Sequence, residues 1–502
     1  MLSELLCETH VLEVIGDSAV ELTGITTDSR QVLPGQVFVA CPGQHVDGRQ
    51  FISRAVEAGA VAVVCEPPGP SALGVPLILV PNARRALAEL ATAFYQHPSE
   101  HLGLIGVTGT DGKTTTTHLV TAILRAAGFR SGLISTVALD RGHKAEPNPT
   151  SHTTPDAPII QENLARMRKA GIQIAALEVS SHALELGRVI GCNFDCAVFT
   201  NLDPEHLDFH GSLTNYRAAK AKLFAQLDHG KAKPWGRLAV VNVDDPSSQA
   251  MRSACSVPWI GFGFGENATI RGTILRANLA STTFRVDTPE DHRTIETRLA
   301  GQYNVANWLG AIAAARHFGA TLEDAERAAA EFTGVPGRLE PVRCGQPFNV
   351  FVDFAHTPQG LAATLTLLRQ QTYGRLIVLF GQAGHRDLRN RDRMAAAVAA
   401  AADLVIITSD DPYDEDPQQI VNDLARSFRQ RGWRENREFW RIVDRRAAIE
   451  FSISLAHRGD CVLLAGRGAE TVTTIQDQVI PLVDADVAHA TLLREKSHAQ
   501  SA

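Results

Sequence analysis

The chain has 502 residues, too many for one hydrophobic core, so several domains are expected. With 44% hydrophobic and 21% charged residues and a net charge of −7, it has a globular composition and no sign of a nucleic-acid-binding surface. Its start lacks the basic segment of a secretory signal, and no apolar run approaches the roughly 20 residues of a membrane span. Eight cysteines without a C-x-x-C pair favour reduced thiols and a cytoplasmic location.

Residues 1 to about 98 predict a small α/β domain. A strand is expected over residues 37–40, between polar turns that contain Asp28-Ser29-Arg30 and Gln44-His45. These turns are either well-capped loops or a cradle for a polar, nucleotide-like ligand. The segment 97–100 is expected to link this domain to the next.

Residues 104–115 predict a phosphate-binding loop. An apolar strand over residues 104–107 precedes a glycine-rich turn, and a helix is expected from Thr114 to Ala127. In such loops, backbone N–H groups and the helix N-terminus bind phosphate oxygens. Lys113 would reach the β- and γ-phosphates, and the Thr114 hydroxyl would bind Mg²⁺. The match to G-x-x-x-x-G-K-[ST] is imperfect, because five residues separate Gly106 from Gly112, so an ordinary glycine turn is the alternative.

Alternating strands and helices from about residue 101 to 336 predict a doubly wound parallel sheet. Its strands are expected over residues 104–107, 132–136, 174–178, 197–201 and 238–243. Ligands of such sheets bind at the carboxyl ends of strands. Glu178 and His206 are expected at two of these ends, where they would bind a divalent metal beside the phosphates. A histidine that only forms hydrogen bonds is the alternative.

Two further positions in this region have two interpretations each. Lys220 lies in a helix predicted over residues 213–227, where a solvent-exposed lysine is the simplest interpretation. Asn304 lies at the start of a predicted alanine-rich helix. Its side chain either caps that helix or contacts a nucleotide base.

A second doubly wound sheet is predicted after the segment 334–338. Its strands are expected over residues 350–354, 376–380, 404–408 and 461–465, and its helices over residues 358–371, 390–402, 417–431 and 445–457. Polar segments follow the strands, at residues 353–358, 381–387, 408–417 and 466–470. A substrate site at this edge of the sheet, facing the P-loop, is the expected consequence.

Several motifs together carry a resemblance to one family. They are Thr-Gly-Thr-x-Gly-Lys-Thr-Thr, Glu-Val-Ser-Ser-His, Phe-Thr-Asn-Leu-x-x-x-His-Leu-Asp-x-His-Gly, Tyr-Asn-Val-x-Asn, Pro-Gly-Arg and Asp-Phe-Ala-His-Thr-Pro. The chain resembles the Mur ligases over nearly its whole length, most closely the UDP-N-acetylmuramoyl-tripeptide synthetases. The resemblance implies a small N-terminal α/β domain for the UDP-sugar (1–98), a central P-loop domain with a doubly wound parallel sheet for ATP (99–336) and a C-terminal Rossmann-like α/β domain for the amino acid (337–502).

The resemblance also implies the residues of each site. The UDP-muramoyl-dipeptide would be bound by Ser29, Arg30, Gln44, His45, Thr153, Thr154, Ser180 and Arg188. ATP would be bound by Gly109, Thr110, Gly112, Lys113, Thr114, Thr115, Asn304, Arg338 and Asp353. Catalysis would depend on Lys113, Glu178, His206 and Lys220, and Mg²⁺ would be bound by Thr114, Glu178, His206 and Lys220, the last as a carbamate formed with CO₂. The incoming amino acid would be bound by Arg386, Asp410, Asp411 and Glu470.

The implied activity is ATP-dependent amide ligation in peptidoglycan precursor synthesis. The D-glutamate carboxylate of the precursor would attack the γ-phosphorus of ATP, and the amine of the incoming amino acid would attack the acyl phosphate that forms. Metal ions, Lys113 and the loop N–H groups would offset the negative charge, and domain closure would keep water away. A monomer with small-molecule substrates, and without nucleic acid or membrane insertion, is expected.

Departures from the family pattern affect the amino-acid substrate. Asp111 stands where asparagine is usual, and Gly-Arg-Gly-Ala-Glu at residues 466–470 replaces Gly-Lys-Gly-His-Glu. Tyr413 replaces the arginine of Asp-Asn-Pro-Arg, which grips the distal carboxylate of meso-diaminopimelate, and a tyrosine cannot form that charged fork. The acidic residues at 410, 411, 414, 415 and 416 suit a cationic side chain. We therefore favour L-lysine or L-ornithine over meso-diaminopimelate.

Two other functions remain open. A Mur-like ligase of specialised metabolism is one, although the UDP-side motifs at residues 28–49 argue against it. A non-catalytic Mur-like binding subunit is the other, although Lys113, Glu178, His206 and Lys220 are all present. Folate-polyglutamate ligases share the P-loop type, but we do not expect this N-terminal domain in them.

Overall fold

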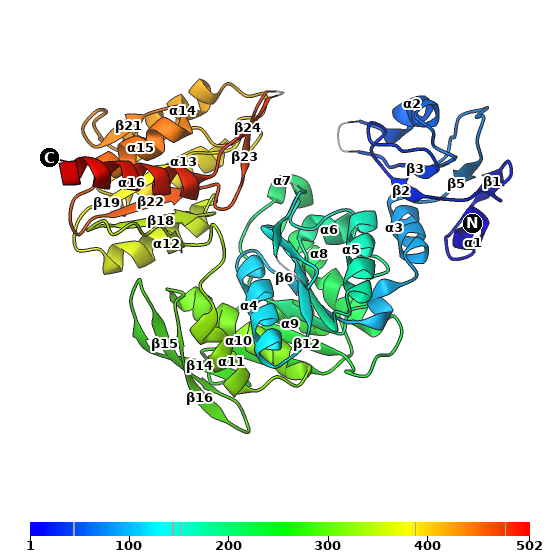
Figure 1. The fold of residues 1–502 in the computed structure, drawn as a ribbon, viewed down its shortest axis with the longest axis horizontal. Helices are drawn as coiled ribbons and strands as arrows, with labels where there is room; N and C mark the ends of the chain where they lie inside the picture. The colour runs from blue at the N-terminus through cyan, green and yellow to red at the C-terminus, as the bar shows by residue number, and fades with distance from the viewer. Residues whose placement is uncertain (44–45, 143–144, 151, 387, 477, 502) are drawn as a thin grey trace. The chain divides into compact units, whose positions relative to one another are not determined.

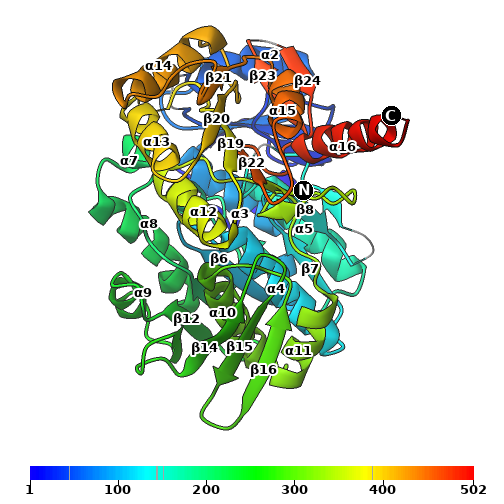
Figure 2. The ribbon, with the colours of Figure 1, turned by 90° about the vertical axis from the view of Figure 1, so that its left-hand side faces the viewer.

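The computed structural model describes residues 1–502 except 44–45, 143–144, 151, 387, 477 and 502. Figures 1 and 2 show an α/β protein in which several sheets are each covered by helices. The chain divides into two compact units. The first contains Met1–Thr273, Arg285–Ile295 and Ala306–Ala329, and the second contains Ile274–Phe284, Glu296–Val305 and Ala330–Ala502.

The N-terminal part of the first unit is a five-stranded sheet in the order β1-β5-β4-β3-β2. Its strands are β1 (Glu13–Ile15), β2 (Gly24–Thr26), β3 (Gln36–Ala40), β4 (Ala62–Cys65) and β5 (Leu77–Leu79). Only β1 is antiparallel to its neighbour among these strands. Helices α1 (Leu2–Leu6) and α3 (Ala83–Phe94) pack on one face, and α2 (Ile52–Glu57) packs on the other. Burial on both faces explains the continuous apolar runs of β3 and β4.

The central sheet of the first unit runs in the order β13-β12-β11-β6-β10-β7-β8-β9. The first six strands are parallel, and β8 and β9 are antiparallel additions. Their bounds are β6 (Gly103–Thr108), β7 (Ser131–Ile134), β8 (Ala138–Asp140), β9 (Glu146–Pro147), β10 (Ile174–Glu178), β11 (Cys196–Phe199), β12 (Leu238–Asn242) and β13 (Trp259–Gly263). The strands β14 (Ile270–Ala277), β15 (Thr282–Asp287) and β16 (His292–Thr297) follow.

Helices cover both faces of the central sheet. One face packs against α5 (Ala157–Lys169), α6 (Ser181–Glu185), α8 (Leu213–Ala225) and α9 (Ser248–Ser253). Helix α4 (Lys113–Ala126), which follows the predicted P-loop, packs on β6, β7 and β10 and contacts α10 (Gln302–His317) through Thr116 and Asn307. The remaining helices are α7 (Leu207–His210) and α11 (Leu322–Glu331).

The second unit contains a six-stranded sheet in the order β17-β18-β22-β19-β20-β21. Its strands are β17 (Glu340–Pro341), β18 (Asn349–Asp353), β19 (Leu376–Phe380), β20 (Leu404–Ile407), β21 (Phe439–Arg441) and β22 (Cys461–Ala465), and β23 (Val472–Ile475) and β24 (Gln478–Pro481) form a separate hairpin. Helices α12 (Pro358–Gln371), α13 (Arg389–Ala399) and α14 (Pro417–Gln430) cover one face, and α15 (Arg445–Ser454) and α16 (Asp484–Ser501) cover the other.

The structure confirms the α/β class and both doubly wound sheets. The expected strands and helices are present, with ends that shift by up to three residues. The strands β14–β16 and the hairpin β23–β24 are additions that the sequence analysis does not predict. The domain boundaries at residues 98 and 336 stay predictions.

Candidate functional site

The turn between β6 and α4, which is predicted to bind phosphate, requires glycine at two positions. Gly109 and Gly112 have φ values of 155° and 78°. A Cβ at Gly109 would lie 1.8 Å from Thr200 Oγ1, and a Cβ at Gly112 would lie 2.2 Å from Asn307 Oδ1, so only glycine fits at both positions. The Thr200 hydroxyl also donates to the Asp111 carbonyl at 2.6 Å, which fixes the loop to the end of β11.

Two lysines converge on this loop. Lys113 Nζ donates to the carbonyls of Gly109 at 3.1 Å and Thr110 at 2.6 Å, and Lys220 Nζ donates to the Gly109 carbonyl at 2.5 Å. Lys220 is 1% exposed, so the interpretation as a solvated surface lysine is wrong. Burial, and next the charge of Lys113, lower the pKa of Lys220 well below its ordinary value.

A buried carboxylate lies beside the first turn of α4. Glu178 Oε1 accepts a hydrogen bond from Thr114 Oγ1 at 3.0 Å, and its Oε2 accepts from the Thr136 N–H at 2.8 Å and the Thr136 hydroxyl at 2.9 Å. A hydroxyl and a carboxylate oxygen are ligands that Mg²⁺ prefers. The structure therefore brings two of the four predicted metal-binding residues together, and their chemistry fits the ion.

His206 lies among other rings. Its backbone is left-handed, with φ 54°, and its ring centroid lies 4.6 Å from that of His182 and 6.3 Å from that of Tyr216. Burial lowers the pKa of His182 to about 4, so that ring is neutral near pH 7. The metal role of His206 stays a prediction.

Three residues predicted for the muramoyl-dipeptide meet at the end of β10. Thr154 Oγ1 donates to the Glu178 carbonyl at 2.9 Å and accepts from the Ser180 N–H at 2.9 Å. Arg188 Nη1 donates to the Thr154 carbonyl at 2.8 Å, and its Nε lies 2.8 Å from Asp156 Oδ1. Thr153 precedes this group in the chain. A cavity of about 50 Å³ beside it is lined by residues that include Thr27, Cys41, Arg84, Asp156 and Arg188.

The structure describes two of the four residues predicted to bind UDP, Ser29 and Arg30. Ser29 is buried, and Arg30 is exposed and donates to Asp28 from Nε and Nη2, both at 2.9 Å. Arg30 holds the pKa of Asp28 below its usual value. Asp28 therefore orients Arg30. Gln44 and His45 lie outside the described residues.

Two of the residues predicted for ATP line a pocket in the second unit. Asn304 and Arg338 contribute to a cavity of about 370 Å³, which is within the usual range of ligand pockets. Arg298 and Arg343, which the sequence analysis does not single out, line the same pocket. Asp353 instead accepts the Leu339 N–H at 2.6 Å, so it fixes the segment that follows Arg338.

The segment that contains Gly337 crosses the loop after β22 so closely that the two backbones are in contact. A Cβ at Gly337 would lie 2.0 Å from Ala469 N, and a Cβ at Gly468 would lie 2.7 Å from the Gly337 carbonyl oxygen. Both glycines have positive φ values, of 67° and 55°. No side chain fits between the two segments, so glycine is required on both sides.

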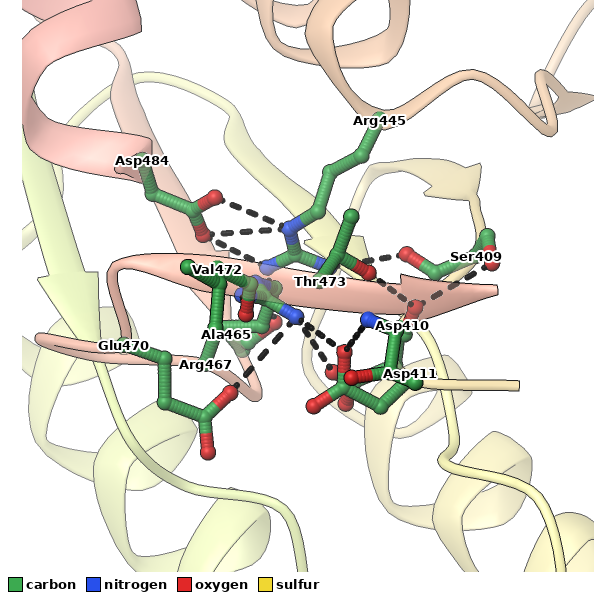
Figure 3. A network of polar contacts seen from close by, with 11 residues as sticks. Ser409, Asp410, Asp411, Arg445, Ala465, Arg467, Glu470, Val472, Thr473 and Asp484 are labelled. Atoms are coloured by element: carbon green, nitrogen blue, oxygen red, sulfur yellow. Dashed lines mark hydrogen bonds and ion pairs between the residues drawn. The ribbon is translucent and has the colours of Figure 1, made fainter. Parts of the chain in front are cut away.

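The predicted amino-acid residues come together except for one. Asp410, Asp411 and Glu470 surround the guanidinium of Arg467 (Figure 3), whereas Arg386 is exposed on the loop after β19. One oxygen from each of the three carboxylates lies within 4.8 Å of the other two. Burial, and next the charge of Asp410, raise the pKa of Glu470 to about 8.

The other acidic residues of this loop already have partners within the chain. Asp414 pairs with His385, and Glu415 pairs with Arg391 at 2.5 Å. Asp416 accepts the Gln418 N–H at 2.9 Å and caps α14. These three acids therefore do not support a site for a cationic side chain.

Comparison with known proteins identifies the family. The model of the Mur ligase middle domain matches residues 107–315, that of the Mur ligase glutamate ligase domain matches residues 337–468, and that of the Mur ligase family catalytic domain matches residues 21–95. The UDP-N-acetylmuramoyl-L-alanyl-D-glutamate–2,6-diaminopimelate ligase of Geobacillus thermodenitrificans is 42% identical over 470 residues, 94% of each chain. The chain belongs to the Mur ligase family.

Other relatives agree with this assignment. The UDP-N-acetylmuramyl-tripeptide synthetase of a Roseiflexus species is 41% identical over 459 residues, 90% of each chain. A solved structure of a UDP-N-acetylmuramoyl-L-alanyl-D-glutamate–2,6-diaminopimelate ligase superimposes with a TM-score of 0.66, at 30% identity and 99% coverage of both chains. This Mur ligase is an ATP-dependent enzyme that joins an acid to an amino acid. Among its described helices, none is long and apolar enough to cross a bilayer.

Proposed function

We propose that this Mur ligase adds meso-diaminopimelate to UDP-N-acetylmuramoyl-L-alanyl-D-glutamate in peptidoglycan precursor synthesis. The observation that carries the assignment is the 42% identity, over nearly the whole chain, to a relative named for 2,6-diaminopimelate. A second relative of that name is 38% identical over 97% of the chain. The preference for L-lysine or L-ornithine is not confirmed, and the names of the relatives favour the alternative.

A substrate without the second carboxylate remains the second candidate because of Tyr413. This residue occupies the position of the expected arginine, and its side chain is partly exposed. It offers no positive charge to a distal carboxylate. If meso-diaminopimelate is the substrate, another cationic group must take that role.

The proposed reaction proceeds in two steps. A D-glutamate carboxylate oxygen bonds to the γ-phosphorus of ATP while the bond to the bridging oxygen breaks, and ADP leaves. The neutral amine of the incoming amino acid then attacks the acyl carbon, loses a proton, and phosphate leaves. Lys113 and the loop N–H groups stabilise the charge that gathers on the γ-phosphoryl oxygens. Thr114, Glu178, His206 and carbamylated Lys220 would hold Mg²⁺, and the metal ion would supply further positive charge.

We extend the proposal to the other ends of the substrates. Ser29 and Arg30, with Gln44 and His45, bind the UDP end, and Thr153, Thr154, Ser180 and Arg188 bind the muramoyl-dipeptide. Asn304 and Arg338 bind the adenosine end of ATP, with Asp353 fixing the adjoining backbone. We also propose a cytoplasmic location and a monomer.

Phosphate release with a panel of amino acids tests the substrate. The protein would receive ATP, Mg²⁺ and UDP-N-acetylmuramoyl-L-alanyl-D-glutamate with meso-diaminopimelate, L-lysine or L-ornithine in separate reactions. We expect turnover with meso-diaminopimelate. Turnover with only L-lysine or L-ornithine would establish the second candidate, and no turnover with any of the three would favour a ligase of specialised metabolism.

Carbamylation of Lys220 is a separate prediction. Burial lowers the pKa of Lys220 and so favours the neutral amine. The free electron pair of a neutral amine can bond to the carbon of CO₂ with loss of a proton and formation of an anionic oxygen ligand. In ¹³C-bicarbonate we expect a carbamate resonance in the NMR spectrum of the wild type, and its absence from Lys220→Ala.

The matched control for this experiment is Lys222→Ala. Lys222 lies on the same helix but is partly exposed and pairs with Glu185 at 2.6 Å. Its replacement should leave the carbamate resonance intact. A resonance that persists in Lys220→Ala would assign the modification to another amine.

A further inference from the structure

Arg467 lies at the centre of the predicted amino-acid site. Its side chain is fully buried, and its Nη1 atom lies 2.8 Å from Asp411 Oδ1 and 3.6 Å from both Asp410 Oδ1 and Glu470 Oε2. One guanidinium group therefore contacts all three carboxylates, as Figure 3 shows.

We propose, on the basis of the function proposed above, that Arg467 is a positioning residue that holds these three carboxylates in the arrangement that receives the incoming amino acid. Arg467 need not contact the substrate itself for this role. It acts through Asp410, Asp411 and Glu470, whose oxygens then point to fixed positions.

The contacts of Arg467 connect two segments that are far apart in the sequence. Its Nη2 donates to the Val472 carbonyl at the start of β23, while its Nη1 binds the loop after β20. The same two segments meet through the Thr474 N–H, which donates to Asp411 Oδ1 at 2.9 Å, and through the Thr473 hydroxyl, which donates to the Asp410 carbonyl at 3.1 Å. The guanidinium therefore fixes both the carboxylates and the hairpin that supports them.

The charge balance of the cluster also depends on Arg467. Three neighbouring carboxylates repel one another, and burial adds the cost of desolvation. Burial raises the pKa of both Asp410 and Glu470. The charges of Arg445 and Arg467 oppose the rise for Asp410, and Arg467 has the larger opposing effect on Glu470. A guanidinium among these oxygens supplies the positive charge that a bound cation would otherwise have to supply.

A lysine cannot reproduce this arrangement. Arginine carries two terminal nitrogens in a rigid plane, and here one binds Asp411 while the other binds the Val472 carbonyl. Lysine keeps the charge but has one nitrogen on a flexible stem. The variant Arg467→Lys therefore separates the geometric role of the residue from its charge.

Arg445 offers a matched control in the same network. It is also buried, and it pairs with Asp484 at 2.6 Å and donates to the carbonyls of Ser409 at 3.2 Å and Ala465 at 2.9 Å. It forms no hydrogen bond with the three carboxylates among the contacts of the described residues (Figure 3). Its charge also acts on Asp410 and Glu470, and lysine keeps that charge. Arg445→Lys should therefore lower stability without changing amino-acid recognition.

The test measures kcat and the KM of each substrate for full-length wild type, Arg467→Lys, Arg467→Gln and Arg445→Lys. For Arg467→Gln we expect the KM of the amino acid to rise about 30-fold or more, because a desolvated charge loses its partner. Arg467→Lys should raise it about fivefold to tenfold. The KM of ATP should stay within about twofold of the wild-type value in both variants.

A rise of the amino-acid KM in Arg467→Lys, with no such rise in Arg445→Lys, supports the positioning role even if Arg467→Gln does not fold. An unchanged amino-acid KM in Arg467→Lys, or equal rises for all substrates, overturns it. The KM is measured with whichever amino acid the wild type uses. Turnover with L-lysine alone would therefore overturn the assignment of meso-diaminopimelate and leave the role of Arg467 intact, whereas a wild type without any turnover would overturn both.

Discussion

Replacing Lys113 with alanine should lower the kcat of this Mur ligase by about 10²–10³-fold, the cost of removing one donor that stabilises transition-state charge. Lys113 is the first residue of α4, and its ammonium group already lies within hydrogen-bonding distance of the loop carbonyls of Gly109 and Thr110. When ATP binds, that charge would be available to the γ-phosphoryl oxygens. Phosphate release at saturating substrates measures the effect.

Lys222→Ala is the control for this prediction too, because it removes a lysine of the same charge from an exposed position. Its kcat should remain close to that of the wild type. Thermal unfolding of both variants establishes that they are folded. A Lys113→Ala variant with near wild-type kcat would contradict the P-loop role of this lysine.

Replacing Lys233 with alanine should lower the free energy of unfolding by about 3–5 kcal/mol, the typical cost of breaking a buried ion pair. Lys233 Nζ lies 2.6 Å from Asp195 Oδ2, and the two side chains are 3% and 1% exposed. The same ammonium group donates to the carbonyls of Ser99 at 2.9 Å, Leu102 at 3.0 Å and Asn193 at 2.7 Å. Its removal leaves the buried Asp195 carboxylate without its cation, with the Leu104 N–H still donating to Oδ2 at 2.7 Å, and takes one donor from each of the three carbonyls. Urea unfolding measures the loss.

The pH dependence of this variant follows from the same pair. Burial already raises the pKa of Asp195 above its ordinary value, and without Lys233 that pKa rises further. A carboxyl group whose pKa is higher in the folded than in the unfolded chain lowers the free energy of unfolding as pH rises above the unfolded-state pKa. The stability that Lys233→Ala loses relative to the wild type should therefore be smallest in acid and grow toward neutral pH. The double variant Asp195→Leu with Lys233→Met should recover part of the stability. Equal stability of wild type and Lys233→Ala at pH 7 would contradict the prediction.

The sequence predicts best those site residues that follow buried parallel strands. The strand before the P-loop has six consecutive buried residues, and Glu178 closes a strand of five. Such runs are long and apolar, so both the strand and the polar residue at its end are visible in the sequence. The structure accordingly places Lys113, Thr114 and Glu178 together.

Residues whose role depends on distant partners escape sequence analysis. Arg467 is a single arginine between two glycines, and its partner Asp411 is 56 residues away. Lys233 and Asp195 come from separate loops, and neither belongs to a motif. The burial of Lys220 could not be predicted either, because the sequence of its helix shows no pronounced apolar face. Only the packing of the folded chain gives these residues their partners.

The acidic loop shows how charge counts mislead when pairing is unknown. Counting five acids near Tyr413 suggested a site for a cation, but Asp414, Glu415 and Asp416 bind groups of the chain itself. Formal charge is a property of the sequence, whereas the field at a site depends on which charges remain uncompensated.

The close crossing of Gly337 and Gly468 limits how this enzyme can be recombined with relatives. The two backbones touch without intervening side chains, so the segment from Gly334 to Arg338 and the loop that carries Glu470 must keep their shapes together. A chimaera that joins a foreign C-terminal sheet at residue 337 would pair one parent's linker with the other parent's loop. An exchange intended to transfer amino-acid specificity should therefore place its junction upstream, near Ala330, where the second unit resumes in the chain.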